Sequence, residues 1–158
     1  MKRPAMTIHH ANPRGTGTAL RLELHPARPD AEGSILATIA PQKATTPAPS
    51  FDWDNSIAVR LGILDLAKIL QVFRGQYESI DDGKGLYIRT SNGSTVVRLI
   101  SRVKPFAGYL LVFSHMPNDG DGDSVCFSFS MTYAEGFALS EAIGHAMLYV
   151  SFGVPIAD

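Results

Sequence analysis

The feature of this sequence that most constrains its fold is an almost uninterrupted apolar stretch near the C-terminus, from Tyr133 to Val150. Thr132 and Glu135 have the spacing of a capping box, which predicts a helix beginning at residue 133. A helix that is apolar around most of its circumference cannot bury itself by packing one stripe onto one sheet. We therefore predict a homo-oligomer formed through this helix. The residues expected at its interface are Phe137, Ile143, Met147 and Val150.

Alternation of apolar and polar residues dominates the rest of the chain and predicts β-strands. Leu20, Leu22 and Leu24, for example, alternate with Arg21 and Glu23. Strands are predicted over residues 20–24, 34–40, 57–61, 85–90, 94–103, 108–115 and 124–131.

Residues 63–73 instead show helical spacing. Ile63, Leu66, Leu70 and Phe73 form one apolar stripe, and Gly75 is a suitable C-terminal stop. The order is therefore strands, helix, strands, helix. It predicts an α+β fold with two four-stranded antiparallel sheets, each followed by a helix.

The 158 residues are enough for one domain with a core. Residues 1–15 are rich in Pro, His and Asn and are predicted to be a flexible N-terminus; residues 16–153 form the single domain, and residues 154–158 a C-terminal tail. Residues 42–50 follow Pro41 and contain Pro47 and Pro49, which predicts a long loop.

Positive charge is concentrated in one part of a chain whose net charge is only −1. From Lys84 to Lys104 there is no Asp or Glu, and beyond Lys104 there is no Lys or Arg. Such a local basic segment is what nucleic-acid binding needs, although solvated arginines on the wet face of a sheet give the same pattern.

Short landmarks of the sequence resemble the Whirly family of single-stranded-DNA-binding proteins and the related mitochondrial guide-RNA-binding proteins. Arg14-Gly15-Thr16-Gly17-Thr18-Ala19-Leu20 lies where that family has a Lys-Gly-Lys-Ala-Ala-Leu strand motif. Phe51-Asp52-Trp53-Asp54 resembles its aromatic-Asp-Trp segment, and the terminal apolar helix occupies the position of its tetramer-forming helix. Both lysines of the family motif are replaced here, by Thr16 and Thr18, which removes positive charge from that strand.

The resemblance implies a homotetramer that binds single-stranded DNA, or RNA, with low sequence specificity. Such binding needs cations along the phosphates and flat side chains beneath the bases. If Leu86, Ile88, Val97, Leu99 and Val103 face the core, the opposite face carries cations and an aromatic ring. The candidate nucleic-acid-binding residues are Arg21, Phe51, Trp53, Arg60, Tyr87, Arg89, Arg98, Arg102 and Lys104.

Two alternatives stay open at this point. Trp53 and Tyr87 are large rings that could equally close the edge of the core. The same fold could also serve as an oligomeric protein-interaction scaffold that binds no nucleic acid.

No motif for catalysis, metal binding or a cofactor emerges, so the chain is predicted not to be an enzyme. Cys126 has no nucleophile motif around it, although His115 or His145 could act as its base. Asp119, Asp121 and Asp123 begin like an EF-hand, but Ser124 and Ser130 replace its glycine and its final glutamate. His9 and His10 alone form no specific metal site.

The expected location is the cytoplasm, in association with the nucleoid; an organellar location stays open. The N-terminus lacks the apolar core of a secretory signal, and no apolar run is long enough to span a bilayer. The single cysteine, Cys126, cannot form an intramolecular disulfide and is compatible with a reducing compartment.

Overall fold

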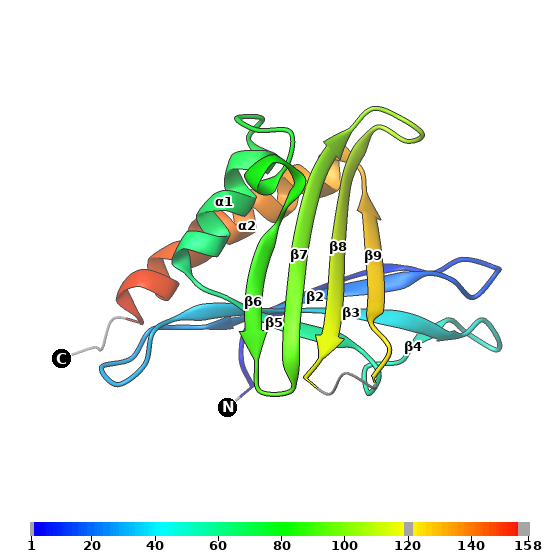
Figure 1. Ribbon diagram of the computed structural model, residues 1–158, viewed down its shortest axis with the longest axis horizontal. Coiled ribbons are helices and arrows are strands. Elements are labelled where there is room, and N and C mark those ends of the chain that lie inside the picture. The colour runs from blue at the N-terminus through cyan, green and yellow to red at the C-terminus, as the bar shows by residue number, and fades with distance from the viewer. Residues whose placement is uncertain (1, 119–121, 155–158) are drawn as a thin grey trace.

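The strands of two antiparallel sheets cross each other in the computed structural model, and both helices lie side by side against them (Figure 1). The structure describes residues 2–118 and 122–154. Sheet 1 contains β1 (Ala5–His10), β2 (Thr18–His25), β3 (Ser34–Ala44), β4 (Ser50–Phe51) and β5 (Ile57–Leu61). Sheet 2 contains β6 (Leu86–Thr90), β7 (Gly93–Arg102), β8 (Gly108–Pro117) and β9 (Val125–Met131). The helices are α1 (Ile63–Phe73), α2 (Tyr133–Phe152) and the short 3-10 turn η1 (Ile80–Gly83).

Each sheet is four strands wide and is followed by a helix, as predicted. In sheet 1 the order is β1-β2-β3, and the fourth position is shared by two segments: β4 pairs with the end of β3, and β5 pairs with its first half. Sheet 2 is a meander with the order β6-β7-β8-β9. The hairpin turn between β6 and β7 consists of Ser91 and Asn92, because Thr90 pairs with Gly93.

The inner faces of both sheets and one face of each helix share a single core. Alternation places Leu20, Ile39 and Val59 of sheet 1 in it, with Val97 and Phe113 of sheet 2. All five side chains are buried because the sheets meet face to face and the helices close the remaining side. Each sheet therefore keeps an outer face, formed by the alternate residues that point away from this core.

The helix boundaries follow the predicted signals. Gly75, just after α1, has a φ of +76°, a conformation that favours glycine. At the start of α2 the capping box is present: the Glu135 N–H donates to Thr132 Oγ1 over 3.1 Å, and the Thr132 N–H donates to Glu135 Oε1 over 3.0 Å. The helix α2 continues past Val150 to Phe152, and Gly153, with a φ of +78°, follows its last residue.

The first turn of α2 approaches β8 so closely that only glycine fits. A Cβ atom on Gly136 would lie 2.3 Å from Cε2 of Tyr109. The Tyr109 ring packs edge-on against Phe73 of α1 and Tyr133 of α2, with centroid distances of 5.0 and 5.4 Å, and its hydroxyl donates to the Phe73 carbonyl over 3.2 Å. Tyr109 thus joins β8 to both helices.

Strand β1 lies in the segment predicted to be a flexible N-terminus, so that prediction was wrong for Ala5–His10. The strand pairs with β2 along its whole length. Its inward residues include His10, whose ring stacks on Phe129 at a centroid distance of 4.4 Å and whose Nε2 lies 2.6 Å from Glu135 Oε2. A partnered histidine takes an inward position here, which is why alternation of apolar residues did not reveal the strand.

Strand β3 continues four residues past its predicted end at Ala40. Pro41 lacks an N–H, but its carbonyl accepts from the Asp52 N–H over 2.8 Å, and the Gln42 N–H donates to the Gly17 carbonyl over 2.8 Å. The predicted loop over residues 42–50 is therefore shorter, because Gln42, Lys43 and Ala44 belong to the strand. In the acidic loop between β8 and β9, residues 119–121 lie outside the described residues, as do residues 155–158 of the predicted tail.

Gly136→Ala is expected to lower the free energy of unfolding by about 1–3 kcal/mol, because the added methyl overpacks the Tyr109 ring. The gain in helix propensity, about 1 kcal/mol, works in the opposite direction. Gly144→Ala is the matched control in the same helix, since its Cβ would meet only the end of the flexible Arg74 side chain, at 3.0 Å. Urea denaturation of both variants measures the difference. Equal stability of the two would contradict the contact between Gly136 and Tyr109.

The pH dependence of stability should report on Glu135. Burial raises the pKa of this carboxyl group, but hydrogen bonds from the Thr132 N–H and from His10 lower it more, so the net pKa lies below 4.5. Because the folded-state pKa is the lower one, the stabilisation is fully present above about pH 4.5 and is lost as the pH falls through the folded-state pKa.

Glu135→Ala should therefore cost about 1 kcal/mol of unfolding free energy at pH 7, and the difference from wild type should shrink in acid. The exposed Glu141 of the same helix provides the control, as Glu141→Ala. Denaturation curves from pH 7 to pH 3 measure both. A Glu135→Ala deficit that stays constant over this range would show that the carboxylate is not the stabilising group.

Candidate functional site

The predicted binding residues of sheet 1 lie on its outer face. Arg21 of β2 pairs across the strands with Thr38, and Arg60 of β5 pairs with Leu36. The Arg21 Nη2 donates to Glu23 Oε2 over 3.3 Å, and the Arg60 Nη1 donates to Ser34 Oγ over 2.8 Å. Both cations are thus positioned by neighbours on the same face.

Phe51 and Trp53 lie at one end of sheet 1. Phe51 packs against His9 of β1 with a ring-centroid distance of 5.2 Å. Trp53 follows in the turn before β5, where its carbonyl accepts from Ser56 Oγ over 2.7 Å, and its side chain is 36 % exposed. In the same turn, a hydrogen bond from the Asn55 amide to Asp52 lowers the pKa of Asp52. Trp53 is therefore held at the surface rather than in the core.

Sheet 2 places its predicted cations around an apolar centre. On its outer face Tyr87 is 67 % exposed and Arg89 is exposed, whereas Arg98 and Arg102 are half-buried. The Arg98 Nε donates to the Gly83 carbonyl over 3.3 Å, and the Arg102 Nη2 donates to Ser130 Oγ over 3.2 Å. Among the described residues, the buried Arg102 Nε has no hydrogen-bond partner. The apolar residues between these side chains are half-buried: Val96, Ile100, Leu110 and Val112.

The four strands of sheet 2 carry no Asp or Glu on this outer face, within the described part of the chain. Ser114 and Ser128 complete it toward β9. The cations of this face can pair with the charges of an anionic polymer. Its exposed ring and apolar centre can contact flat, apolar groups of the same polymer, and the hydroxyl groups can form hydrogen bonds with it.

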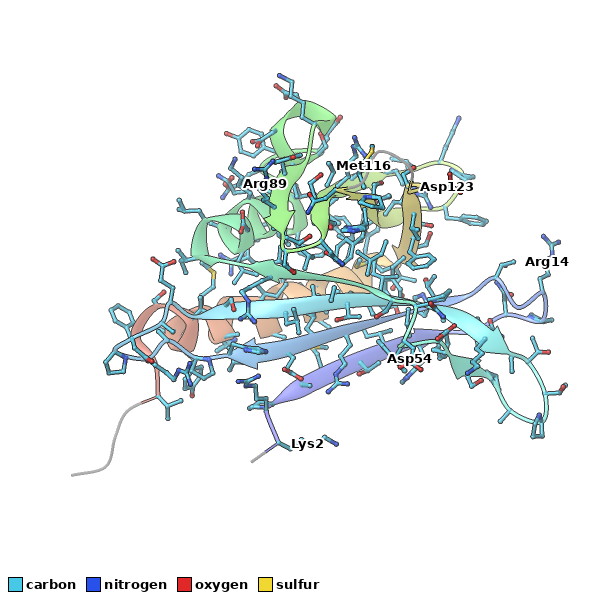
Figure 2. All side chains as sticks on the ribbon, turned by 60° about the horizontal axis from the view of Figure 1, so that its bottom comes forward. Lys2, Arg14, Asp54, Arg89, Met116 and Asp123 are labelled. Carbon is cyan, nitrogen blue, oxygen red and sulfur yellow. The ribbon has the colours of Figure 1, made fainter. Side chains whose placement is uncertain are left out.

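The predicted residues divide between two surfaces. Arg21, Phe51 and Arg60 belong to sheet 1, and Tyr87 and Arg89 belong to sheet 2. Figure 2 shows Arg89 above the strands of sheet 1, on β6. The predicted cations and rings therefore do not form one continuous strip, and Arg21, Phe51, Arg98 and Arg102 are half-buried.

The hairpin between β7 and β8 adds exposed residues that the sequence reasoning missed. Phe106 is 73 % exposed beside Lys104. Val103, expected in the core, is 74 % exposed, so that expectation was wrong: β7 ends at Arg102 and the alternation ends with it. A phenylalanine inside a Pro-Gly turn was the available signal for an exposed ring.

A groove of about 540 Å³ where the two sheets meet was also missed. Asn55 from the turn before β5 and Asn92 from the β6–β7 hairpin line it, together with His115 and Phe127. These residues come from two turns and two strands, so no local pattern brings them together.

The outward side of α2 is apolar and open to solvent. Phe137 is 66 % exposed, Leu148 62 % and Phe152 86 %. By contrast, Ile143 and Val150 are 4 % exposed and belong to the core of the chain itself, and Met147 is half-buried against that core. Of the four predicted interface residues, Phe137 alone is on the exposed side.

The groups considered for other chemistry lie apart. Cys126 is exposed on the outer face of sheet 2. His115 points inward instead, and its Nδ1 lies 2.9 Å from Thr95 Oγ1. The His145 Nδ1 lies 2.7 Å from the Glu141 carbonyl. The described residues contain no group of three or more side chains that could hold a metal ion, and no helix among them is long and apolar enough to cross a membrane.

This architecture defines an α+β protein with two crossed antiparallel sheets, each followed by a helix. No family model and no curated protein matches the sequence. Among solved structures, Arabidopsis thaliana WHY1 is similar with a TM-score of 0.74 and 16% identity, covering 96% of this chain and 87% of that chain. WHY3 of the same plant is similar with a TM-score of 0.68 and 16% identity, covering 95% of this chain and 89% of that chain. The trypanosome MRP1/MRP2 structure is similar with a TM-score of 0.63 and 19% identity, covering 96% of each chain. The chain thus has the Whirly fold.

Proposed function

We propose that this protein binds single-stranded nucleic acid, DNA or RNA, with low sequence specificity, and acts as a homotetramer. The observation that carries the proposal is the outer face of sheet 2, where Arg89, Arg98 and Arg102 surround an apolar centre without any carboxylate in those strands. The Whirly fold of this chain also supports the proposal. The Whirly family, which the sequence resembles, consists of single-stranded-DNA-binding proteins.

The chemistry follows from the separate parts of that face. Guanidinium groups pair with phosphates, and this contact is independent of base identity. Tyr87, with 67 % of its surface exposed, offers a ring on which a base can stack. The half-buried centre of Val96, Ile100, Leu110 and Val112 gives further bases an apolar floor. Every base has a π-face and every nucleotide a phosphate, so the binding tolerates any sequence.

Assembly would use the exposed side of α2. Phe137, Leu148 and Phe152 lie on that side with few charges beside them, notably Glu141. A surface of large exposed apolar residues marks an interaction site. The sheet faces then stay available for the nucleic acid.

Arg89→Ala with Arg98→Ala should weaken binding of labelled oligo-dT and flatten its salt dependence. Each lost phosphate contact on a single strand lowers the slope of log K against log salt by about 0.7, so the double variant should lose about 1.4. Fluorescence anisotropy at several salt concentrations measures it. Lys68→Ala with Arg74→Ala, which removes the same charge from the α1 region, is the matched control. No binding of wild type even at low salt would favour the protein-interaction scaffold.

Tyr87→Ala should lower affinity without changing the salt slope, because stacking is worth about 1–3 kcal/mol per base and involves no counterion release. Trp53→Ala tests the other sheet in the same assay. A loss confined to Tyr87→Ala assigns binding to sheet 2, and a loss confined to Trp53→Ala assigns it to sheet 1. Unchanged affinity in both variants would remove aromatic stacking from the mechanism.

Leu148→Asp is expected to dissociate the oligomer, because the charge enters the apolar side of α2. Met116→Asp is the matched control: Met116 is 59 % exposed, close to the 62 % of Leu148, but it lies on β8 of sheet 2. Light scattering gives the mass of each folded variant. Wild-type mass for Leu148→Asp would remove this side of α2 from the interface.

A further inference from the structure

We propose that a groove at the end of sheet 1 binds a terminal phosphate group of the nucleic acid; this inference rests on the proposed function. The groove has a volume of about 440 Å³. Among the described residues, its lining brings together three guanidinium groups from separate parts of the chain and the carboxylate of Glu32. Two further carboxylates lie next to the groove, where Glu23 pairs with Arg3 and Asp30 pairs with Arg28. The polar lining residues are Arg3, His25, Arg28, Glu32 and Arg60.

Arg60 is fixed on one wall of the groove. Its Nη1 donates to Ser34 Oγ over 2.8 Å and lies 3.4 Å from Nδ1 of His25. Since a guanidinium can only donate, His25 Nδ1 is the acceptor. The His25 Nε2, in turn, lies 2.7 Å from Glu23 Oε1. The head group of Arg60 is thus oriented before any ligand arrives.

Glu23 also orients the second guanidinium. The Arg3 Nη1 lies 3.8 Å from Glu23 Oε1. The backbone before β1 is held as well, because the Leu24 N–H donates to the Pro4 carbonyl over 2.9 Å. Arg3 keeps 53 % of its side chain exposed, so most of its donors still face solvent.

Arg28 comes from the β2–β3 hairpin, whose backbone is pinned to α2. Arg28 and Ala31 exchange backbone hydrogen bonds of 2.8 and 3.1 Å, and the Ala27 N–H donates to the Tyr149 carbonyl over 2.9 Å. A Cβ on Gly33 would lie 2.3 Å from the Val150 carbonyl oxygen, so the hairpin rests directly on the helix. The ion pair of Arg28 with Asp30 is 3.8 Å long and largely exposed, and it competes weakly for the guanidinium.

The three guanidinium groups, with several donors each, favour a phosphate monoester over the diester of an internal nucleotide. A monoester carries about −1.5 to −2 charges at neutral pH and offers three acceptor oxygens, whereas a diester carries one charge. Arginine pairs with such oxygens through two parallel hydrogen bonds. Arg60 belongs both to this groove and to the outer face of sheet 1.

Oligo-dT with a terminal phosphate, at the 5′ or the 3′ end and labelled at the other end, tests the site against the same strand with hydroxyl ends. Wild type should bind one phosphorylated form about tenfold more tightly, the effect of one or two charge-assisted hydrogen bonds. Arg28→Ala and Arg3→Ala should bring the two affinities to a common value. Arg14→Ala, at the tip of the β1–β2 hairpin at the opposite end of sheet 1 (Figure 2), should keep the difference.

The outcomes separate this inference from the proposed function. Oligo-dT binding without any preference for a phosphorylated end overturns the terminal-phosphate site and leaves the proposed function standing. If no oligonucleotide binds, a titration with dTMP followed by NMR decides: saturable amide shifts at Arg28 and Arg60 that disappear in Arg28→Ala support a phosphate site. The absence of such shifts overturns it.

Discussion

The packing of Tyr109 between the two helices is the contact on which the arrangement of the rest depends. Its ring fills the space left by Gly136 and lies edge-on to Phe73 and Tyr133. Its hydroxyl also satisfies the carbonyl at the end of α1. Because one residue of β8 fixes the end of α1 and the start of α2, both helices are held against the same side of the crossed sheets. The outer faces of the sheets are consequently left uncovered.

The uncovered faces explain why half-buried apolar residues persist on sheet 2. Val96 and Ile100 point away from the core, yet their neighbours Arg98 and Arg102 lie along the same face and shield part of their surface. Long cationic side chains commonly cover apolar surface with their methylene stems while the charge stays in water. The result is a surface on which the charge is peripheral and the centre is apolar. That distribution suits bases at the centre and phosphates at the rim.

The sequence predicted elements well where one local pattern decided them. Alternation identified β2 and the strands of sheet 2, and the capping box identified the start of α2, because these signals act over a few residues. The sequence did not predict β1, because one of its inward positions is taken by His10, which is stabilised by Phe129 and Glu135. Those partners are distant in sequence, and no local pattern contains them.

The candidate site was predictable in its residue types and not in its geometry. Exposure of Tyr87 and Arg89 follows from alternation, but the division of the cations between two sheets depends on how the sheets cross. The same limit applies to α2: composition revealed an apolar helix, but which side is buried depends on contacts with sheet 2 and α1. Ile143 and Val150 were thus assigned to an interface although they fill the core. Phe137 and Leu148 are on the open side.

Under the proposed function, the modest charge of each chain makes assembly part of the binding mechanism. Three arginines on the outer face of sheet 2 give an expected salt slope of only about 2, since each phosphate contact on a single strand contributes about 0.7. The overall charge of −1 adds no long-range attraction for a polyanion. Several such faces joined through α2 would bind one strand at once. Each contact after the first is then intramolecular, and avidity can raise the affinity by about a hundredfold or more without any new residue. Thr16 and Thr18 add no positive charge at the start of β2, so under the proposed function the affinity depends more on assembly through α2 than on further cations.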